Sequence, residues 1–221
     1  MTVAIAITNY NHGRFLETAI TSALGQTTRP DEVIVVDDES TDSSNEILQR
    51  FTSKVQIVRQ RHAGVVAARN LAIEAISSTH IVFLDADDYL MPHFLRWTLA
   101  AWHFPRRRRI GLVYCPARAV GDGPTTPETI GYVHTRPWDV TQLAKQNFVM
   151  TTSLFLRRAL LDVGGYSAAY SEIGHEDWDL VLKFVERGWH GRLMPNPLFC
   201  VRNVPGSRNK ISLERHGRQV R

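Results

Sequence analysis

The sequence predicts an α/β fold, a mostly parallel sheet flanked by helices, and two observations support this prediction. Short apolar runs rich in β-branched residues alternate with longer amphipathic stretches through the first half of the chain, which is the pattern of a parallel sheet covered by helices. Each apolar run also ends in polar residues, as strands of open α/β sheets do where they bind ligands. With 221 residues, 43% of them hydrophobic, the chain can bury a core, and we expect a single domain over residues 1–221.

The elements of the first half follow from local apolar patterns. "VAIAIT" (3–8), "EVIVVDD" (32–38), "KVQIVRQ" (54–60) and "HIVFLDAD" (80–87) read as strands. Between the first two strands, residues 14–26 place Phe15, Ala19, Ile20, Ala23 and Leu24 at helical spacing. Residues 44–51 and 64–76 predict the next two helices, the latter entered through Gly64. The first half is therefore expected to build the sheet.

The second half is less regular. A helix is expected at 92–102 and a strand at 110–115, followed by a long loop over 116–135, where Gly, Pro and Thr are frequent. Such a loop more often serves a site than a core. A last helix is predicted at 176–188, with Gly188 closing it and one apolar face formed by Trp178, Val181, Leu182, Val185 and Trp189.

Net charge, cysteine content and the N-terminal segment bear on the protein's partners and its expected location. The formal net charge of +4 is too small to choose between anionic partners. The two cysteines, Cys115 and Cys200, cannot make a disulfide framework and lack the paired spacing of a zinc site, so a reducing cytoplasm is the simplest location. The N-terminal apolar run is broken by Thr8 and Asn9 and has no basic flank. It is therefore expected to be a core strand and neither a signal peptide nor a membrane span.

Four polar clusters follow the predicted strands: "TNYN" (8–11), "DDES" (37–40), "RHAG" (61–64) and "DADD" (85–88). We expect them to meet at one edge of the sheet, because the carboxyl ends of parallel strands lie there. In an extended segment Asp85 and Asp87 point the same way and Asp88 points oppositely. A converging carboxylate pair could bind Mg²⁺ or Mn²⁺. The alternative is that these acids cap the following helix or make ordinary turn contacts.

Five segments together resemble the inverting glycosyltransferases of family 2, which have the GT-A fold. They are "ITNYNHGRFLETAITSALGQT", "EVIVVDDESTD", "HAGVVAARNLAI", "IVFLDADDYLMP" and "GHEDWDLVLKFVERG". The resemblance extends from Val3 to about Ser207 and is weakest over 106–147. It implies transfer of one sugar from a nucleotide-diphosphate sugar, expected to be a UDP-sugar, to a saccharide or lipid-linked acceptor, with residues 1–100 binding the donor and 101–221 the acceptor. Cell-surface polysaccharide or glycolipid synthesis is the expected setting.

The resemblance also implies which residues bind the donor. Thr8 and Tyr10 would border the nucleotide base, and Asp38 would accept a hydrogen bond from it. Arg69 would reach toward the nucleotide end of the pocket, and Asp85 would lie at the ribose. Each has a structural alternative: Tyr10 could pack beside the first helix, Asp38 could begin an Asx-turn, and Arg69 could pair with Glu74 or a sheet-end carboxylate.

The remaining roles concern the metal and the chemistry. By the same resemblance, Asp87 would ligate Mn²⁺ or Mg²⁺ at the diphosphate. Asp177 would be the general base toward the acceptor hydroxyl, and Glu176 would lie on the acceptor side. Alternatively, Glu176 and Asp177 would only favour the positive end of the helix macrodipole, worth about 0.3–1 kcal/mol.

The chain departs from the family pattern near its C-terminus. In "VRNVPGS" (201–207), Val204 stands where many members carry a histidine, so any metal or phosphate contact of that side chain would be missing. A non-catalytic sugar-nucleotide-binding or scaffold protein therefore stays open as an alternative. A dehydrogenase is disfavoured because no G-x-G-x-x-G turn follows the first strand. The chain also lacks a "QxxRW" motif and membrane helices, both of which are usual in the processive relatives of this family. By this resemblance, transfer of a single sugar is expected.

Two basic segments, Arg106–Arg109 and the tail "RNKISLERHGRQVR" (208–221), raise the question of further partners. A solvated surface is their usual explanation, and no groove-reading or base-stacking context suggests nucleic acid. Contact with the acidic inner surface of a membrane is the other interpretation, since clustered basic residues gain roughly 1 kcal/mol each there. The protein is thus expected in the cytoplasm, with peripheral membrane contact as an option.

Overall fold

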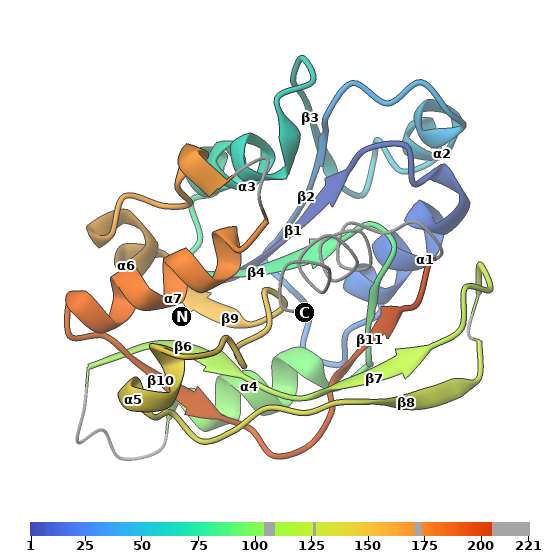
Figure 1. Cartoon of the computed structure of the whole chain (residues 1–221). Coiled ribbons are helices and arrows are strands. Elements are labelled where there is room, and N and C mark those ends of the chain that lie inside the picture. The colour runs from blue at the N-terminus through green and yellow to red at the C-terminus, as the bar shows by residue number, and fades with distance from the viewer. Residues whose placement is uncertain (104–108, 126, 171–173, 205–221) are drawn as a thin grey trace, which may run out of the picture.

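The computed structural model describes residues 1–103, 109–125, 127–170 and 174–204, and it has the predicted mixed α/β architecture (Figure 1). The strands are β1 (Val3–Asn9), β2 (Glu32–Asp37), β3 (Gln56–Arg59), β4 (His80–Asp85), β5 (Tyr89–Leu90), β6 (Ile110–Tyr114), β7 (Ala117–Val120), β8 (Thr129–Val133), β9 (Leu154–Leu156), β10 (His190–Leu193) and β11 (Phe199–Arg202). The helices are α1 (Gly13–Leu24), α2 (Ser44–Gln49), α3 (Gly64–Ala75), α4 (Phe94–Trp102), α5 (Val140–Leu143), α6 (Arg157–Asp162) and α7 (Glu176–Glu186), with a 3₁₀ turn η1 at Ala168–Tyr170.

Seven strands form the main sheet in the order β10-β6-β9-β4-β1-β2-β3. β1 lies between β2 and β4, pairs with both in parallel, and is buried along its whole length. A strand covered on both faces needs a continuous apolar run, which "VAIAIT" supplies. The register sets Thr8 beside Asp85 and Asn9 beside Asp37. The polar ends of β1, β2 and β4 therefore meet at one edge, as the sequence predicts.

Helices cover both faces of this sheet (Figure 1). Because side chains alternate along a strand, β1 sends Val3, Ile5 and Ile7 to one face and Ala4 and Ala6 to the other. The first face packs against apolar residues of α1, α2 and α4. The second packs against α3, α6 and α7. Since α3 and α7 share this face, the start of α7 is brought close to the carboxyl ends of β1 and β4.

The predicted loop over residues 116–135 is wrong, because this segment contains two strands. β7 and β8 pair antiparallel and belong to a second sheet with the order β5-β11-β7-β8. β7 also pairs in parallel with β11, which follows it by about 80 residues in the sequence. β7 thus lies between β8 and this distant partner, and its Ala117 and Val120 are buried. Gly121, Gly123 and Pro124 lie in the connection between β7 and β8.

The other elements of the second half were not predicted either: α5, α6, β9, β10 and β11 are short. β9 lies between β4 and β6 and runs antiparallel to both, so the main sheet is mostly and not wholly parallel. Within the described residues, no helix is long and apolar enough to cross a membrane. Arg106–Arg108 and the basic tail lie outside the described residues.

Candidate active site

Four of the predicted residues form one hydrogen-bonded chain at the carboxyl edge of the main sheet. Arg69 of α3 is only 3% exposed, and its two terminal nitrogens donate to Asp85 Oδ1 at 2.9 Å and to Glu176 Oε1 at 3.0 Å. Thr8 Oγ1 donates to the same Asp85 oxygen at 3.1 Å. Of the alternatives for Arg69, pairing with a sheet-end carboxylate is thus observed. The guanidinium joins the end of β4 to the start of α7.

This network sets the charge state of Asp85. Burial alone would raise the pKa of Asp85, but the charge and hydrogen bond of Arg69, with a further hydrogen bond from Thr8, hold it below its usual range. The pKa of Arg69 is raised despite its burial, because Asp85, Tyr166 and Glu176 surround it. The ring of Tyr166 lies 5.3 Å from the guanidinium carbon, in the range of a cation–π contact. Asp85 is therefore a stable anion whose charge is already balanced.

Asp87 and Asp88 have the opposite electrostatic environment. Burial, and then the neighbouring charge of Asp85, raise the pKa of Asp87. Burial, and then Asp87 and Asp85, raise the pKa of Asp88 well above its usual range. Asp88 Oδ1 accepts the backbone N–H of Arg202 at 2.9 Å, which is a structural contact to β11. Asp87 is thus the acid whose charge remains least compensated.

The donor set at this edge fits a divalent cation held jointly with a ligand. Among the residues described, no group of three or more His, Cys, Asp or Glu side chains is arranged to hold a metal ion. Magnesium sites that act on phosphates commonly use one or two protein carboxylates and take other oxygens from the substrate and water. Asp87 suits such a site, because a cation would relieve the repulsion from Asp85 that raises its pKa.

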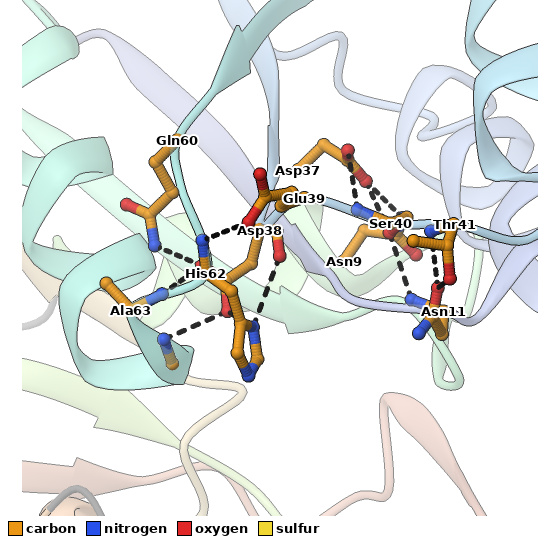
Figure 2. A network of polar contacts seen from close by, with 11 residues as sticks. Asn9, Asn11, Asp37, Asp38, Glu39, Ser40, Thr41, Gln60, His62 and Ala63 are labelled. Atoms are coloured by element: carbon orange, nitrogen blue, oxygen red, sulfur yellow. Dashed lines mark hydrogen bonds and ion pairs between the residues drawn. The ribbon is translucent and has the colours of Figure 1, made fainter.

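Asp38, predicted to contact the base, accepts hydrogen bonds from the loop before α3 (Figure 2). Its Oδ1 accepts from Ala63 N at 2.8 Å and Gln60 Nε2 at 2.6 Å, and its Oδ2 accepts from Gly64 N at 2.9 Å. His62 Nδ1 lies 2.9 Å from Oδ2. The carboxylate thus satisfies the first free N–H groups of α3, where orphan donors are expected.

The turn after β2 is closed by Asp37 and not by Asp38 (Figure 2). Asp37 accepts from the amide of Asn9 at 2.7 Å and from the hydroxyl of Ser40 at 2.7 Å. The side-chain oxygen of Asn11 accepts from Thr41 N at 2.8 Å. Asp37 also accepts the backbone N–H of Ser40 at 3.2 Å, so the Asx-turn alternative for Asp38 is not observed, and Asp38 holds the α3 loop.

Tyr10 does not pack beside the first helix. Its side chain is 42% exposed and stacks on the ring of His62, with centroids 4.1 Å apart and planes 25° apart. His62 was predicted only as part of the "RHAG" cluster. The exposed rings of Tyr10 and His62 lie beside the buried carboxylate of Asp38, near the ends of β1 and β2 and the start of α3.

Asp177 lies in the first turn of α7, after His175, whose φ of 80° is left-handed. Its Oδ1 accepts Trp178 N at 2.8 Å, and its Oδ2 accepts the side-chain amide of Asn147 at 2.9 Å. Burial, and then the charge of the adjacent Glu176, raise the pKa of Asp177. A carboxylate with a raised pKa is better suited to take a proton near neutral pH. Asn147 was not predicted, since nothing local connects it to residue 177.

The sequence matches the model of "Glycosyl transferase family 2" over residues 4–164. The chain belongs to this family. The match includes β1 to β9, hence Thr8, Tyr10, Asp38, Arg69, Asp85 and Asp87, but ends before α7. The resemblance stated from the sequence is thereby confirmed at the level of the family.

Individual members and solved structures agree with this assignment. Chondroitin synthase of Escherichia coli is 29% identical over 84% of this chain. The structure of Staphylococcus aureus TarS 1–349 in complex with UDP-GlcNAc has a TM-score of 0.74 at 17% identity and covers 95% of this chain and 61% of that one. Mannosyltransferase PcManGT of Pyrobaculum calidifontis, in complex with GDP-Man and Mn²⁺, has a TM-score of 0.69 at 18% identity, with coverage of 93% and 58%. The predicted GT-A fold is therefore confirmed.

The chain is much shorter than its curated relatives in the family. It covers 31% of an uncharacterised glycosyltransferase from Nostoc and 27% of the chondroitin synthase. The comparisons thus identify the family and the fold of this unit.

Proposed function

We propose that this family 2 member is an inverting glycosyltransferase that moves one sugar from a UDP-sugar to an acceptor hydroxyl. The observation that carries the proposal is the bridge made by Arg69, which joins Asp85 at the predicted donor side to Glu176, next to the predicted base Asp177. The buried guanidinium of Arg69 thus connects the residues expected to bind the leaving group with those expected to activate the acceptor.

The donor would bind along the carboxyl edge of the sheet. In this proposal the base stacks on Tyr10 and donates to Asp38, Thr8 borders the base, and Asp85 binds the ribose. Uracil is supported by the TarS complex with UDP-GlcNAc, whereas the PcManGT complex contains GDP-Man. The identity of the base is therefore the first point to test.

The chemical step needs a proton acceptor on the acceptor side. As the acceptor oxygen bonds to the anomeric carbon, its proton passes to a carboxylate oxygen of Asp177, and the bond from that carbon to the diphosphate oxygen breaks. Attack opposite the leaving group inverts the carbon, and UDP leaves with the bonding electron pair. The raised pKa of Asp177 favours this proton transfer. Asn147 keeps the carboxylate oriented through its 2.9 Å hydrogen bond.

Asp87 would hold Mn²⁺ or Mg²⁺ together with the diphosphate, and the ion would neutralise charge that develops on the leaving group. The Mn²⁺ in the PcManGT complex supports this proposal. Thr8 and Arg69 keep Asp85 anionic beside it. Val204, in the position of the common histidine, is described and half-buried, so the proposal gives no metal contact to that position.

The acceptor is proposed to be a saccharide or a lipid-linked saccharide in cell-surface polysaccharide synthesis. The similarity to a chondroitin synthase supports a glycan product. Contact with an acidic membrane surface is part of this proposal only through the basic tail, which the structure does not describe. Arg109, at the end of the basic run, pairs with Asp162 at 3.3 Å and lies 3.6 Å from the Trp189 ring centroid. That arginine is thus engaged within the fold.

Titration calorimetry with UDP, GDP and ADP, each with Mn²⁺ and with a chelator, tests the donor assignment. We expect UDP to bind most tightly, and the chelator to weaken its binding. Equal binding of ADP and UDP that the chelator does not affect would refute the roles of both Asp38 and Asp87. A screen of UDP-sugars for release of free UDP would then name the donor. Tight donor binding without transfer to any acceptor would favour the binding-protein alternative.

A further inference from the structure

The carboxylate of Asp38 is buried and closely surrounded. Its oxygens accept three hydrogen bonds of 2.6–2.9 Å, from Gln60 Nε2, Ala63 N and Gly64 N. His62 Nδ1 lies 2.9 Å from Oδ2 and bonds at 3.3 Å to the backbone oxygen of Asp38. The side chain is only 4% exposed, so a nucleobase N–H that approaches the carboxylate has to take the place of one of these groups.

His62 is the group best placed to leave. Ala63 and Gly64 use backbone N–H groups at the start of α3, which would lose their acceptor inside the fold. The His62 side chain is 51% exposed and can turn into water. It also makes a second contact that Gln60 does not make, the 4.1 Å stack on Tyr10.

We propose that His62 occupies the place of the nucleobase and must be displaced before the donor binds. Its imidazole occupies both positions expected of the base: it stacks on Tyr10, and its Nδ1 lies 2.9 Å from the carboxylate of Asp38. At the observed ring spacing no base fits between Tyr10 and His62, because two successive stacks would need about twice that distance. This inference rests on the proposed function, which assigns the base to Tyr10 and Asp38, and it adds a residue that governs affinity.

The test compares UDP affinity in the wild type and in His62→Ala, by calorimetry with Mn²⁺. We expect His62→Ala to bind UDP more tightly by about 3- to 10-fold, because the fraction of the protein that can accept the base no longer depends on His62 leaving. His93→Ala is the matched control: His93 is exposed, its Nδ1 bonds to Thr27 Oγ1 at 3.1 Å, and its removal should leave affinity unchanged.

A second variant guards against misfolding of the first. His62→Phe keeps a ring stacked on Tyr10 and removes the nitrogen beside Asp38, so its UDP affinity should lie between that of the wild type and that of His62→Ala. Weaker or equal UDP binding by His62→Ala would overturn the displacement and indicate that the imidazole supports a base on the other face of Tyr10. If the wild type binds no nucleoside diphosphate at all, the proposed function fails, and this inference fails with it.

Discussion

Two sets of carboxylates lie along the same edge of the sheet, and they differ in how their charge is balanced. Asp37, Asp38 and Asp85 each accept two or more hydrogen bonds from protein donors, and the pKa of Asp85 is lowered. The pKa values of Asp87 and Asp177 are raised instead, chiefly by burial, although Asp177 also accepts two hydrogen bonds. The first set is used to build the loops that shape the site. The second set carries unrelieved charge, as expected of groups that meet a cation or a proton.

The largest expected effect on stability comes from removing Arg69, whose charge balances that of Asp85. Arg69→Met would leave Asp85 and Glu176 without their shared partner, and breaking such a buried pair costs about 3–5 kcal/mol. Chemical denaturation at neutral pH measures the loss in the free energy of unfolding. Arg50→Met is the control, because Arg50 and Glu17 form a 2.7 Å pair in which both side chains are about half exposed. That pair should contribute less than about 1 kcal/mol. Equal losses in the free energy of unfolding would show that the buried contacts of Arg69 stabilise the fold no more than an exposed ion pair does.

A smaller loss is expected when the acceptor at the α3 loop is removed. Asp38→Ala would leave the N–H groups of Ala63 and Gly64 unpaired, which costs about 1–3 kcal/mol in the free energy of unfolding. Glu39→Ala is the matched control, since that exposed neighbour accepts a single bond, from His62 N at 3.1 Å. If both substitutions are neutral, Asp38 is not needed for the loop and would be free to serve the ligand alone.

The smallest effect, and the sharpest contrast, separates Asp85 from Asp87. A lowered pKa means that Asp85 stabilises the fold above its ordinary value of about 3.9 and loses this contribution as the pH falls through its folded value. A raised pKa means that Asp87 destabilises the fold above its folded value and ceases to do so below about 3.9. At pH 7 without metal, Asp85→Asn should therefore lower the Tm and Asp87→Asn should raise it, each by a few degrees.

Thermal unfolding of both variants between pH 4 and pH 7 checks this contrast. The difference between Asp87→Asn and the wild type should shrink toward pH 4. In the presence of UDP, added Mn²⁺ should raise the Tm of the wild type more than that of Asp87→Asn, because ligand binding stabilises the folded state. Tm shifts of the same sign in the two variants would show that Asp85 and Asp87 do not differ in how their charge is balanced.

The sequence predicted the parts of the fold that depend on local pattern. The four strands predicted in the first half were found, because each is a short apolar run; the two-residue β5 was missed. β7 and β8 were missed because β7 pairs with β11, about 80 residues away, and β8 is the edge strand beside β7. β9 has only three residues, too few for a period to be visible.

The candidate site divides in the same way. The strand-end clusters were predictable, because the carboxyl ends of parallel strands share one edge. The bridge from Arg69 to Glu176 spans 107 positions, and the bond from Asn147 to Asp177 spans 30. Neither spacing has a local signal. The stack of His62 on Tyr10 could not be predicted either, since no local pattern distinguishes this histidine from other histidines in loops.

The proposed catalytic role of Asp177 is tested most directly by the rate of sugar transfer in Asp177→Asn, with UDP affinity measured on the same preparation. Asp179→Asn is the control, because Asp179 is another acid of the first turn of α7 and should act on the macrodipole in the same way. We predict that Asp177→Asn lowers transfer by about 10²- to 10⁴-fold while UDP affinity stays near that of the wild type, and that Asp179→Asn has little effect. Transfer by Asp177→Asn at the wild-type rate would contradict the account.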